Sequence, residues 1–132
     1  MPVDSRLVLV VEDDMASSHA LVKLLESLQY SVLVAITLAE GLRHLVAASP
    51  SVVVLDLLLP DGNGIEMLRA IRRERRPIKV AVISGASDEM LSEASHLEPE
   101  AIFGKPLDVR DFREWLTQKH VHSTRASSER LN

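Results

Sequence analysis

At 132 residues, with 46% hydrophobic and 26% charged side chains, the chain has the size and composition of one globular domain. The lack of cysteine excludes a disulfide framework and a thiolate site, and a net charge of −4 with 3% aromatic residues argues against direct binding to nucleic acid. The sequence has no signal-peptide pattern and no apolar segment of membrane-spanning length, so we expect a cytoplasmic protein without membrane contact.

Five short apolar runs recur along the chain, and each precedes a segment with helical periodicity. The runs cover residues 7–11, 31–35, 52–55, 78–83 and 101–103. Between the runs, apolar residues recur at the spacing of an amphipathic helix, which predicts one buried stripe on each of five helices. The stripes are, in chain order, Leu21, Leu24, Leu25 and Leu28; Leu38, Leu42, Leu45 and Val46; Ile65, Leu68 and Ile71; Leu91, Ala94 and Leu97; Phe112, Trp115 and Leu116.

Local signals mark where several of these helices begin and end. Thr37 and Glu40 have the spacing of a capping box, and Asp108 is a suitable N-cap for the last helix. Pro50 and Pro77 follow helical segments that they cannot continue. The strand–helix unit therefore repeats five times, which predicts an α/β domain with a doubly wound parallel sheet and helices on both faces.

Asp56 directly follows the β-branched apolar run at residues 52–55. A short, uninterrupted run of this kind indicates a strand that is buried on both faces, as in a parallel sheet. Ligands of open α/β sheets bind beyond the carboxyl ends of the strands, and an unpaired buried carboxylate is costly. Asp56 is therefore either a site residue or an aspartate that caps a turn, and its position alone allows both.

Further polar residues follow the other runs and should lie on the same edge as Asp56. Glu12 and Asp13 follow the first run, Ser84 the fourth and Lys105 the fifth. Clustered carboxylates cannot all ionise without a cation between them, and oxygen ligands without histidine or cysteine suit Mg²⁺. A lysine and a hydroxyl supply donors for an anion, so the set is suited to phosphoryl transfer.

Four motifs lie at the ends of the predicted strands. They are Val10-Val11-Glu12-Asp13-Asp14, Leu55-Asp56-Leu-Leu-Leu-Pro60-Asp-Gly-Asn-Gly64, Val82-Ile83-Ser84-Gly85 and Gly104-Lys105-Pro106. Together they resemble the receiver domain of bacterial two-component response regulators. The resemblance implies a flavodoxin-like (βα)5 fold with strand order 2-1-3-4-5. It also implies a receiver domain at residues 1–119. Residues 120–132 are polar and without periodicity, so we expect a disordered tail there.

The resemblance assigns the phosphoryl chemistry to three side chains. Asp56 would accept a phosphoryl group from the phosphohistidine of a sensor histidine kinase or of a phosphotransfer protein. Lys105 would pair with Asp56 and then with the phosphate, and Ser84 would move to bond the phosphoryl oxygens. The family also has a cis peptide bond at the position of Lys105–Pro106, which proline makes accessible.

The same resemblance implies a cation site for Mg²⁺ or Mn²⁺. Asp13 and Asp56 would be direct ligands, Glu12 would act through water, and the backbone carbonyl of Leu58 would complete the protein ligands. Three positions bear on how far the chain follows the family pattern. Ile102 replaces the usual aromatic switch residue, and neither Leu58 nor Ala86 can orient a water molecule, so we expect slow dephosphorylation.

The expected output is a change of surface that a downstream partner, or an effector domain outside this chain, would read. The chain would be either a single-domain regulator or a fragment of a longer regulator or hybrid kinase. A phosphorylation-dependent homodimer through the fourth helix, fifth strand and fifth helix is one alternative output. We expect no enzymatic activity beyond the domain's own phosphorylation and dephosphorylation.

Three other functions are compatible with parts of the sequence. A hydrolase with an aspartyl-phosphate intermediate commonly has an aspartate two residues after the nucleophile, where this chain has Leu58. A flavin-binding protein would need a hydroxyl- and glycine-rich loop after the first strand, where Glu12 and Asp13 would repel a phosphate. A degenerate receiver that binds partners without phosphorylation is the remaining alternative, and the presence of the complete set argues against it: Glu12, Asp13, Asp56, Ser84 and Lys105.

Overall fold

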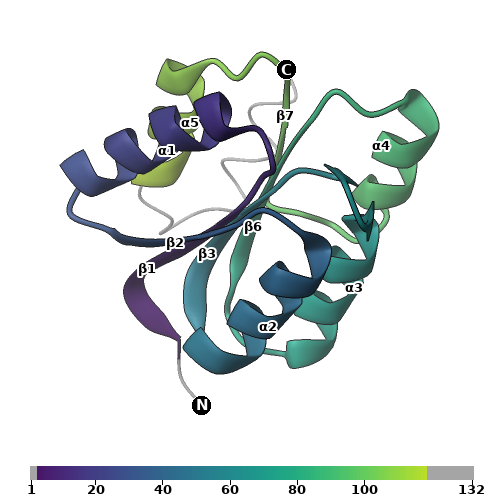
Figure 1. Cartoon of the computed structure of the whole chain (residues 1–132), viewed down its shortest axis with the longest axis horizontal. Helices are drawn as coiled ribbons and strands as arrows, with labels where there is room; N and C mark the ends of the chain where they lie inside the picture. Colours follow the sequence, from purple (N-terminus) through teal and green to yellow (C-terminus); the bar gives the residue numbers. More distant parts are fainter. Residues whose placement is uncertain (1–2, 119–132) are drawn as a thin grey trace.

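The computed structural model describes residues 3–118 and has a five-stranded parallel sheet between two layers of helices (Figure 1). The order of the strands is β2-β1-β3-β6-β7, which confirms the predicted order 2-1-3-4-5 once β6 and β7 are counted as the fourth and fifth strands of the sheet. The strands are β1 (Asp4–Val11), β2 (Ser31–Ala35), β3 (Pro50–Leu55), β6 (Lys79–Ser84) and β7 (Ala101–Gly104). The tail predicted at residues 120–132 lies outside the described residues.

Five helices alternate with these strands and cover both faces of the sheet (Figure 1). They are α1 (Met15–Ser27), α2 (Leu38–Ala48), α3 (Ile65–Glu74), α4 (Asp88–Ser95) and α5 (Val109–Thr117). Helices α1 and α5 pack on one face, and α2, α3 and α4 pack on the other. Among residues 3–118, no helix has the length and apolarity that would be needed to cross a membrane.

The central strand β1 shows why continuous apolar runs form this sheet. Successive side chains of a strand point to opposite faces. Leu9 and Val11 pack with α2 and α3, whereas Val8 and Val10 pack with α1 and α5. All four side chains are fully buried. Burial of each contributes on the order of 1.5–3 kcal/mol, which makes a parallel strand with helices on both faces stable.

A short antiparallel hairpin was not predicted from the sequence. It consists of β4 (Leu58–Leu59) and β5 (Gly62–Asn63), and it lies between β3 and α3. The sequence indicated only a glycine-rich turn at this place. The hairpin directly follows Asp56 and therefore forms part of the surroundings of the candidate site.

The predicted helix caps are present. The Thr37 hydroxyl accepts a hydrogen bond from the Glu40 N–H at 3.1 Å, and the Glu40 carboxylate accepts one from the Ile36 N–H at 2.7 Å. The Asp108 carboxylate accepts a hydrogen bond from the Arg110 N–H at 2.9 Å. These bonds satisfy backbone donors that have no partner within the helix. They fix the starts of α2 and α5, which both follow strand ends at the same edge of the sheet.

Candidate functional site at the carboxyl edge of the sheet

The polar residues predicted to share one edge come from the ends of four neighbouring strands. Glu12 and Asp13 follow β1, Asp56 follows β3, Ser84 ends β6, and Lys105 follows β7. Backbone hydrogen bonds continue the sheet up to this edge, from the Glu12 N–H to the Ala35 carbonyl at 2.9 Å and from the Asp56 N–H to the Val11 carbonyl at 3.0 Å. The parallel topology therefore places segments far apart in the sequence at one rim.

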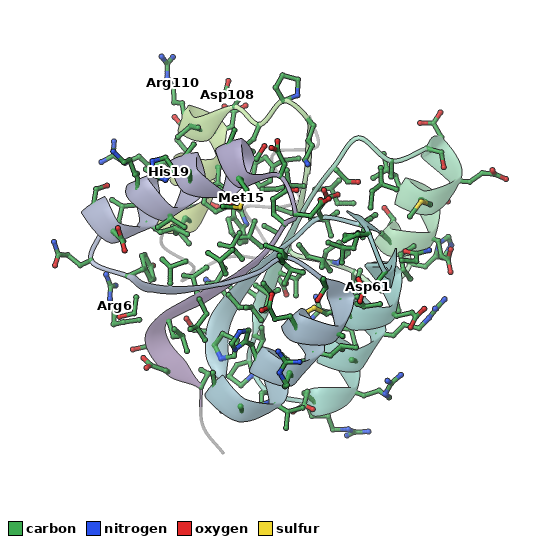
Figure 2. The ribbon with its side chains drawn as sticks, viewed as in Figure 1. Arg6, Met15, His19, Asp61, Asp108 and Arg110 are labelled. Carbon is green, nitrogen blue, oxygen red and sulfur yellow. The ribbon has the colours of Figure 1, made fainter. Side chains whose placement is uncertain are left out.

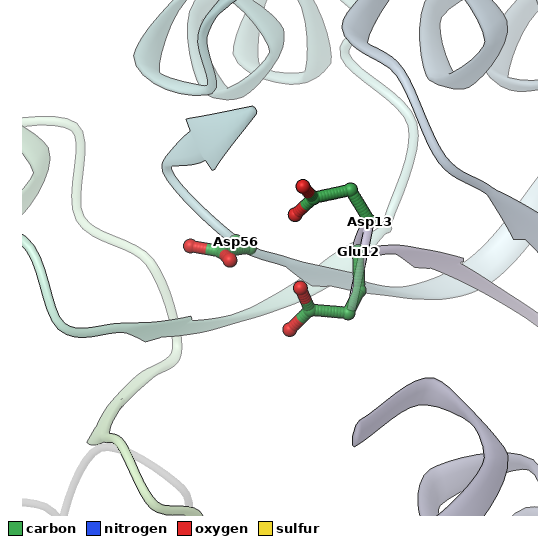
Figure 3. Close-up of side chains that lie close together, drawn as sticks. All are labelled: Glu12, Asp13 and Asp56. Carbon is green, nitrogen blue, oxygen red and sulfur yellow. The ribbon is translucent and has the colours of Figure 1, made fainter. Parts of the chain in front are cut away.

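Three carboxylates lie close together at this rim. Glu12, Asp13 and Asp56 each contribute a carboxylate oxygen, and these oxygens lie within 4.8 Å of one another, directed to the same side (Figure 3). Glu12 and Asp56 are each only 4% exposed, whereas Asp13 is exposed. The donor set is oxygen without nitrogen or sulfur, which fits a hard divalent cation such as Mg²⁺.

The Lys105 ammonium group bridges two of these carboxylates. Its Nζ lies 2.7 Å from Oε1 of Glu12 and 2.9 Å from Oδ2 of Asp56. The sequence predicted the pairing with Asp56 but not the pairing with Glu12. When all three carboxylates are ionised, one ammonium group leaves two negative charges uncompensated. A divalent cation at the three carboxylates would balance them.

Burial and the hydrogen bonds of Lys105 have opposite effects on the pKa values of Glu12 and Lys105. Burial raises the pKa of Glu12, and the neighbouring Asp56 adds to this, while hydrogen bonds from Lys105 and from the Asp14 N–H lower it. Partial burial by itself would lower the pKa of Lys105, but its hydrogen bonds to Glu12 and Asp56 outweigh that effect and raise it. Lys105 is therefore a stable cation in this site at neutral pH.

The Asp56 carboxylate is held at both oxygens. Oδ2 accepts the hydrogen bond from Lys105, and Oδ1 accepts one from the Leu58 N–H at 3.0 Å. Gly64 packs tightly below this turn, because a Cβ atom at its position would lie 2.6 Å from the Asp56 carbonyl oxygen and 2.8 Å from Cα of Leu57. Only glycine fits this close approach of backbone to backbone.

Ser84 is buried beside this group at the end of β6, with 2% of its surface exposed. Its hydroxyl oxygen accepts a hydrogen bond from the Ala86 N–H at 3.1 Å. Within residues 3–118, the Ser84 hydroxyl donates no hydrogen bond. A buried donor without an acceptor is unfavourable, so this proton is available to an anion that enters the site.

Two further predictions for this edge concern β7 and the turn that follows it. The Lys105–Pro106 peptide bond is cis, which confirms the prediction. Ile102 is 40% exposed on the surface of β7. Phe103 faces the opposite side of the strand, as predicted, and its ring lies 5.7 Å from the ring of Phe112 in α5. Neither residue of β7 offers a polar atom to the site.

Sequence reasoning gave no role to Asp61, although the residue lies inside a quoted motif. Its carboxylate accepts hydrogen bonds from two backbone N–H groups at the start of α2, at 2.6 Å from Leu38 and 3.0 Å from Ala39. An aspartate after proline in a turn gives no signal of such a distant partner. The contact is a product of the tertiary fold.

Comparison with known proteins agrees with this geometry. The family model described as "Response regulator receiver domain" matches residues 8–117. The acid tolerance regulatory protein ActR of Rhizobium meliloti (strain 1021) is 30% identical over 112 residues, which cover 84% of this chain and 58% of ActR. The KDP operon transcriptional regulatory protein KdpE of Escherichia coli (strain K12) is 40% identical over 82 residues, which cover 62% of this chain and 36% of KdpE.

Solved structures give the same result. A CheY-like response regulator receiver domain protein from Methanospirillum hungatei JF-1 superposes with a TM-score of 0.82 at 28% identity, covering 93% of this chain and 99% of that one. The chain spans little more than half the length of ActR and about a third of KdpE. The family match extends over nearly all of the described residues and includes every residue of the rim. The chain therefore belongs to the receiver domain family of two-component response regulators.

Proposed function

We propose that this receiver domain accepts a phosphoryl group on Asp56 from a phosphohistidine of a sensor histidine kinase or of a phosphotransfer protein. The observation that carries the proposal is the buried Asp56 carboxylate, fixed at both oxygens by Lys105 and the Leu58 N–H and placed beside two further carboxylates. Positioning and charge compensation provide most of the catalysis in phosphoryl transfer, and this site supplies both.

In the transfer step, an oxygen of the Asp56 carboxylate attacks phosphorus while the phosphorus–nitrogen bond to the donor imidazole breaks. The electron pair of that bond remains on the imidazole nitrogen. Lys105 stays within reach of Asp56 and can exchange the carboxylate oxygen for a phosphoryl oxygen. Ser84 can donate its hydroxyl proton to a second phosphoryl oxygen, because this hydroxyl donates no hydrogen bond within residues 3–118.

Glu12, Asp13 and Asp56, together with the Leu58 backbone carbonyl, are the groups that we propose to hold Mg²⁺ or Mn²⁺. A bound divalent cation would neutralise charge that gathers on the transferred phosphoryl group. Glu12 also has a role that does not require it to be a direct metal ligand. It forms an ion pair with Lys105, which positions the ammonium group beside the phosphoacceptor Asp56.

The output of phosphorylation would be a shift in the population of surface conformations near Ser84 and Ile102. A downstream partner, or an effector domain outside this chain, would bind the shifted surface. The relatives ActR and KdpE are named as regulatory proteins and are longer than this chain, which supports an effector elsewhere. A homodimer through α4, β7 and α5 is the alternative output, and a cytoplasmic location remains our expectation.

The proposal is tested by incubating the protein with acetyl phosphate and Mg²⁺ and measuring its intact mass. We expect a gain of one phosphoryl group that is abolished in Asp56→Ala and by chelation of the metal. Asp88→Ala is a matched control, because Asp88 is an exposed carboxylate on α4 outside the site, and this variant should be modified normally. An unmodified wild-type protein, or equal modification of Asp56→Ala, would contradict the proposal.

A further inference from the structure

The β4–β5 hairpin is attached to the phosphoacceptor at its base. The Leu58 N–H, at the first residue of β4, donates to Oδ1 of Asp56 at 3.0 Å. The Gly64 N–H, just after β5, donates to the Leu57 carbonyl at 2.8 Å. The orientation of the hairpin therefore determines where the Leu58 backbone and one oxygen of Asp56 lie.

At its tip, the hairpin is attached to α2. Asp61 occupies the turn between β4 and β5, beside the N-terminal end of α2 (Figure 2). Oδ1 accepts from the Leu38 N–H at 2.6 Å, and Oδ2 accepts from the Ala39 N–H at 3.0 Å. These two backbone donors lower the pKa of Asp61, so its carboxylate is ionised at neutral pH. Two bonds from one planar group fix both its distance and its direction.

Asp61 is not the only residue that caps the start of α2. Thr37 and Glu40 already form a reciprocal cap within the same segment, which satisfies the N–H groups of Glu40 and Ile36. Asp61 accepts from two other N–H groups, those of Leu38 and Ala39, although it lies more than twenty positions away from them in the sequence. Its distinctive effect is therefore to connect two separate parts of the chain, the hairpin and the helix.

The hairpin and α2 are also in direct contact. A Cβ atom at Gly62 would lie 2.9 Å from Cδ2 of Leu38, so the backbone of β5 packs directly against the side chain of the first residue of α2. Leu38 and Leu59 are both nearly buried in the core below this contact. Movement of the hairpin tip would have to break the two bonds of Asp61 and open this packing.

We infer that Asp61 is a positioning residue of the phosphorylation site. Its two-point contact with α2 holds the β4–β5 hairpin in the orientation that places the Leu58 backbone and Asp56 at the carboxylate cluster that would hold the cation. This inference rests on the proposed function, since it concerns the same cation site. By linkage, a contact that strengthens cation binding must itself be strengthened by the bound cation to the same extent.

The test measures Mn²⁺ binding directly, from the electron paramagnetic resonance signal of free Mn²⁺, in wild type, Asp61→Ala, Asp61→Asn and Thr37→Ala. Groups that orient metal ligands typically contribute roughly tenfold or more in affinity, and we expect a loss of about that size in Asp61→Ala. Asp61→Asn keeps one acceptor oxygen, so its Mn²⁺ affinity should lie between those of wild type and Asp61→Ala. Thr37→Ala weakens the same helix start without touching the hairpin, so its Mn²⁺ affinity should equal that of wild type.

A second measurement follows amide hydrogen exchange at Leu38 and Ala39 in the wild-type protein. Saturation with Mg²⁺ should slow exchange at these two amides, as linkage requires. Unchanged Mn²⁺ affinity in Asp61→Ala, or an equal loss in Thr37→Ala, would overturn the role of Asp61 while the cation site itself stands. Failure of the wild-type protein to bind Mn²⁺ would instead overturn the proposed function.

Discussion

Replacement of Lys105 by methionine tests the electrostatic design of the site. In the wild-type protein the ammonium group lies 2.7 Å from Glu12 and 2.9 Å from Asp56, and both carboxylates are almost completely buried. Lys105→Met keeps most of the side-chain volume and removes the charge. Two buried carboxylates of the same sign then face each other without a counter-ion, which destabilises the folded state.

The size of the effect follows from burial. Removing one partner of a fully buried ion pair costs about 3–5 kcal/mol. The Lys105 side chain is 27% exposed, so solvent screens part of the interaction. We therefore expect Lys105→Met to lower the free energy of unfolding by about 1–3 kcal/mol at neutral pH without a divalent cation. Lys23→Met is the matched control, because Lys23 is exposed on α1 and has no ion pair within residues 3–118.

The loss should depend on pH with a defined sign. Burial already raises the pKa of Glu12, and removal of the lysine hydrogen bond should raise it further. A carboxyl group with a raised pKa in the folded state stabilises the fold at low pH, and this contribution is lost as pH rises through the folded pKa. Lys105→Met should therefore have a lower free energy of unfolding than Lys23→Met at neutral pH. The difference should be small at pH values below 4.5, the ordinary pKa of a glutamate carboxyl group.

The assay is urea unfolding followed by circular dichroism at several pH values, with and without Mg²⁺. A cation bound by the carboxylates replaces the missing positive charge, so Mg²⁺ should stabilise Lys105→Met more than it stabilises Lys23→Met. The reasoning would be refuted if both variants had the same stability at neutral pH without metal. It would also be refuted if Mg²⁺ stabilised them equally.

Two further predictions concern the immediate surroundings of Asp56. The Leu58 side chain is half exposed and cannot orient a water molecule, so phosphorylated Asp56 should persist for minutes or longer. Leu58→Asn should shorten this lifetime by roughly tenfold. The lifetime is measured from the intact mass after the phosphoryl donor is removed, and a wild-type lifetime of seconds would contradict the prediction. Gly64→Ala should reduce stability by about 1–3 kcal/mol and impair phosphorylation, because the added Cβ meets the backbone of Asp56. Gly85→Ala, where a Cβ atom has open space, should have little effect on stability, and equal losses in both variants would argue against the steric explanation.

Much of the fold could be predicted because its signals are local. Apolar runs and helical periodicity identified the five sheet strands and five helices, and the connection rules for parallel strands restricted their order. The hairpin of β4 and β5 was missed because each strand has two residues, which is too short for a periodic pattern. In sequence, its glycine and proline residues indicate only a turn.

The candidate site was predictable to the extent that strand ends determine it. Glu12, Asp13, Asp56, Ser84 and Lys105 all follow or end apolar runs, so a parallel sheet brings them to one edge. Contacts between side chains and distant backbone groups could not be predicted in this way. The bridge from Lys105 to Glu12 depends on where the turn after β7 directs the lysine, and that direction is set by packing rather than by the local sequence.

Long-range contacts of arginine show the same limit. Arg72 in α3 donates from Nε to the Leu97 carbonyl at 3.0 Å, beyond the end of α4. Arg76 donates to the Leu45 carbonyl at 3.2 Å, near the end of α2. Both side chains donate to backbone carbonyl groups at or beyond the C-terminal ends of helices, where such groups commonly lack partners within the helix. In sequence, the run of basic residues at 72–76 indicates no more than a charged helix end.

The central claim is that the transferred group becomes an acyl phosphate on Asp56. The direct measurement is the intact mass of the protein after incubation with acetyl phosphate and Mg²⁺, before and after treatment with neutral hydroxylamine. The account predicts one added phosphoryl group, located on the peptide that contains Asp56, which hydroxylamine removes because it cleaves acyl phosphates. A stable phosphate on a hydroxyl side chain such as Ser84, or a protein of unchanged mass, would contradict it.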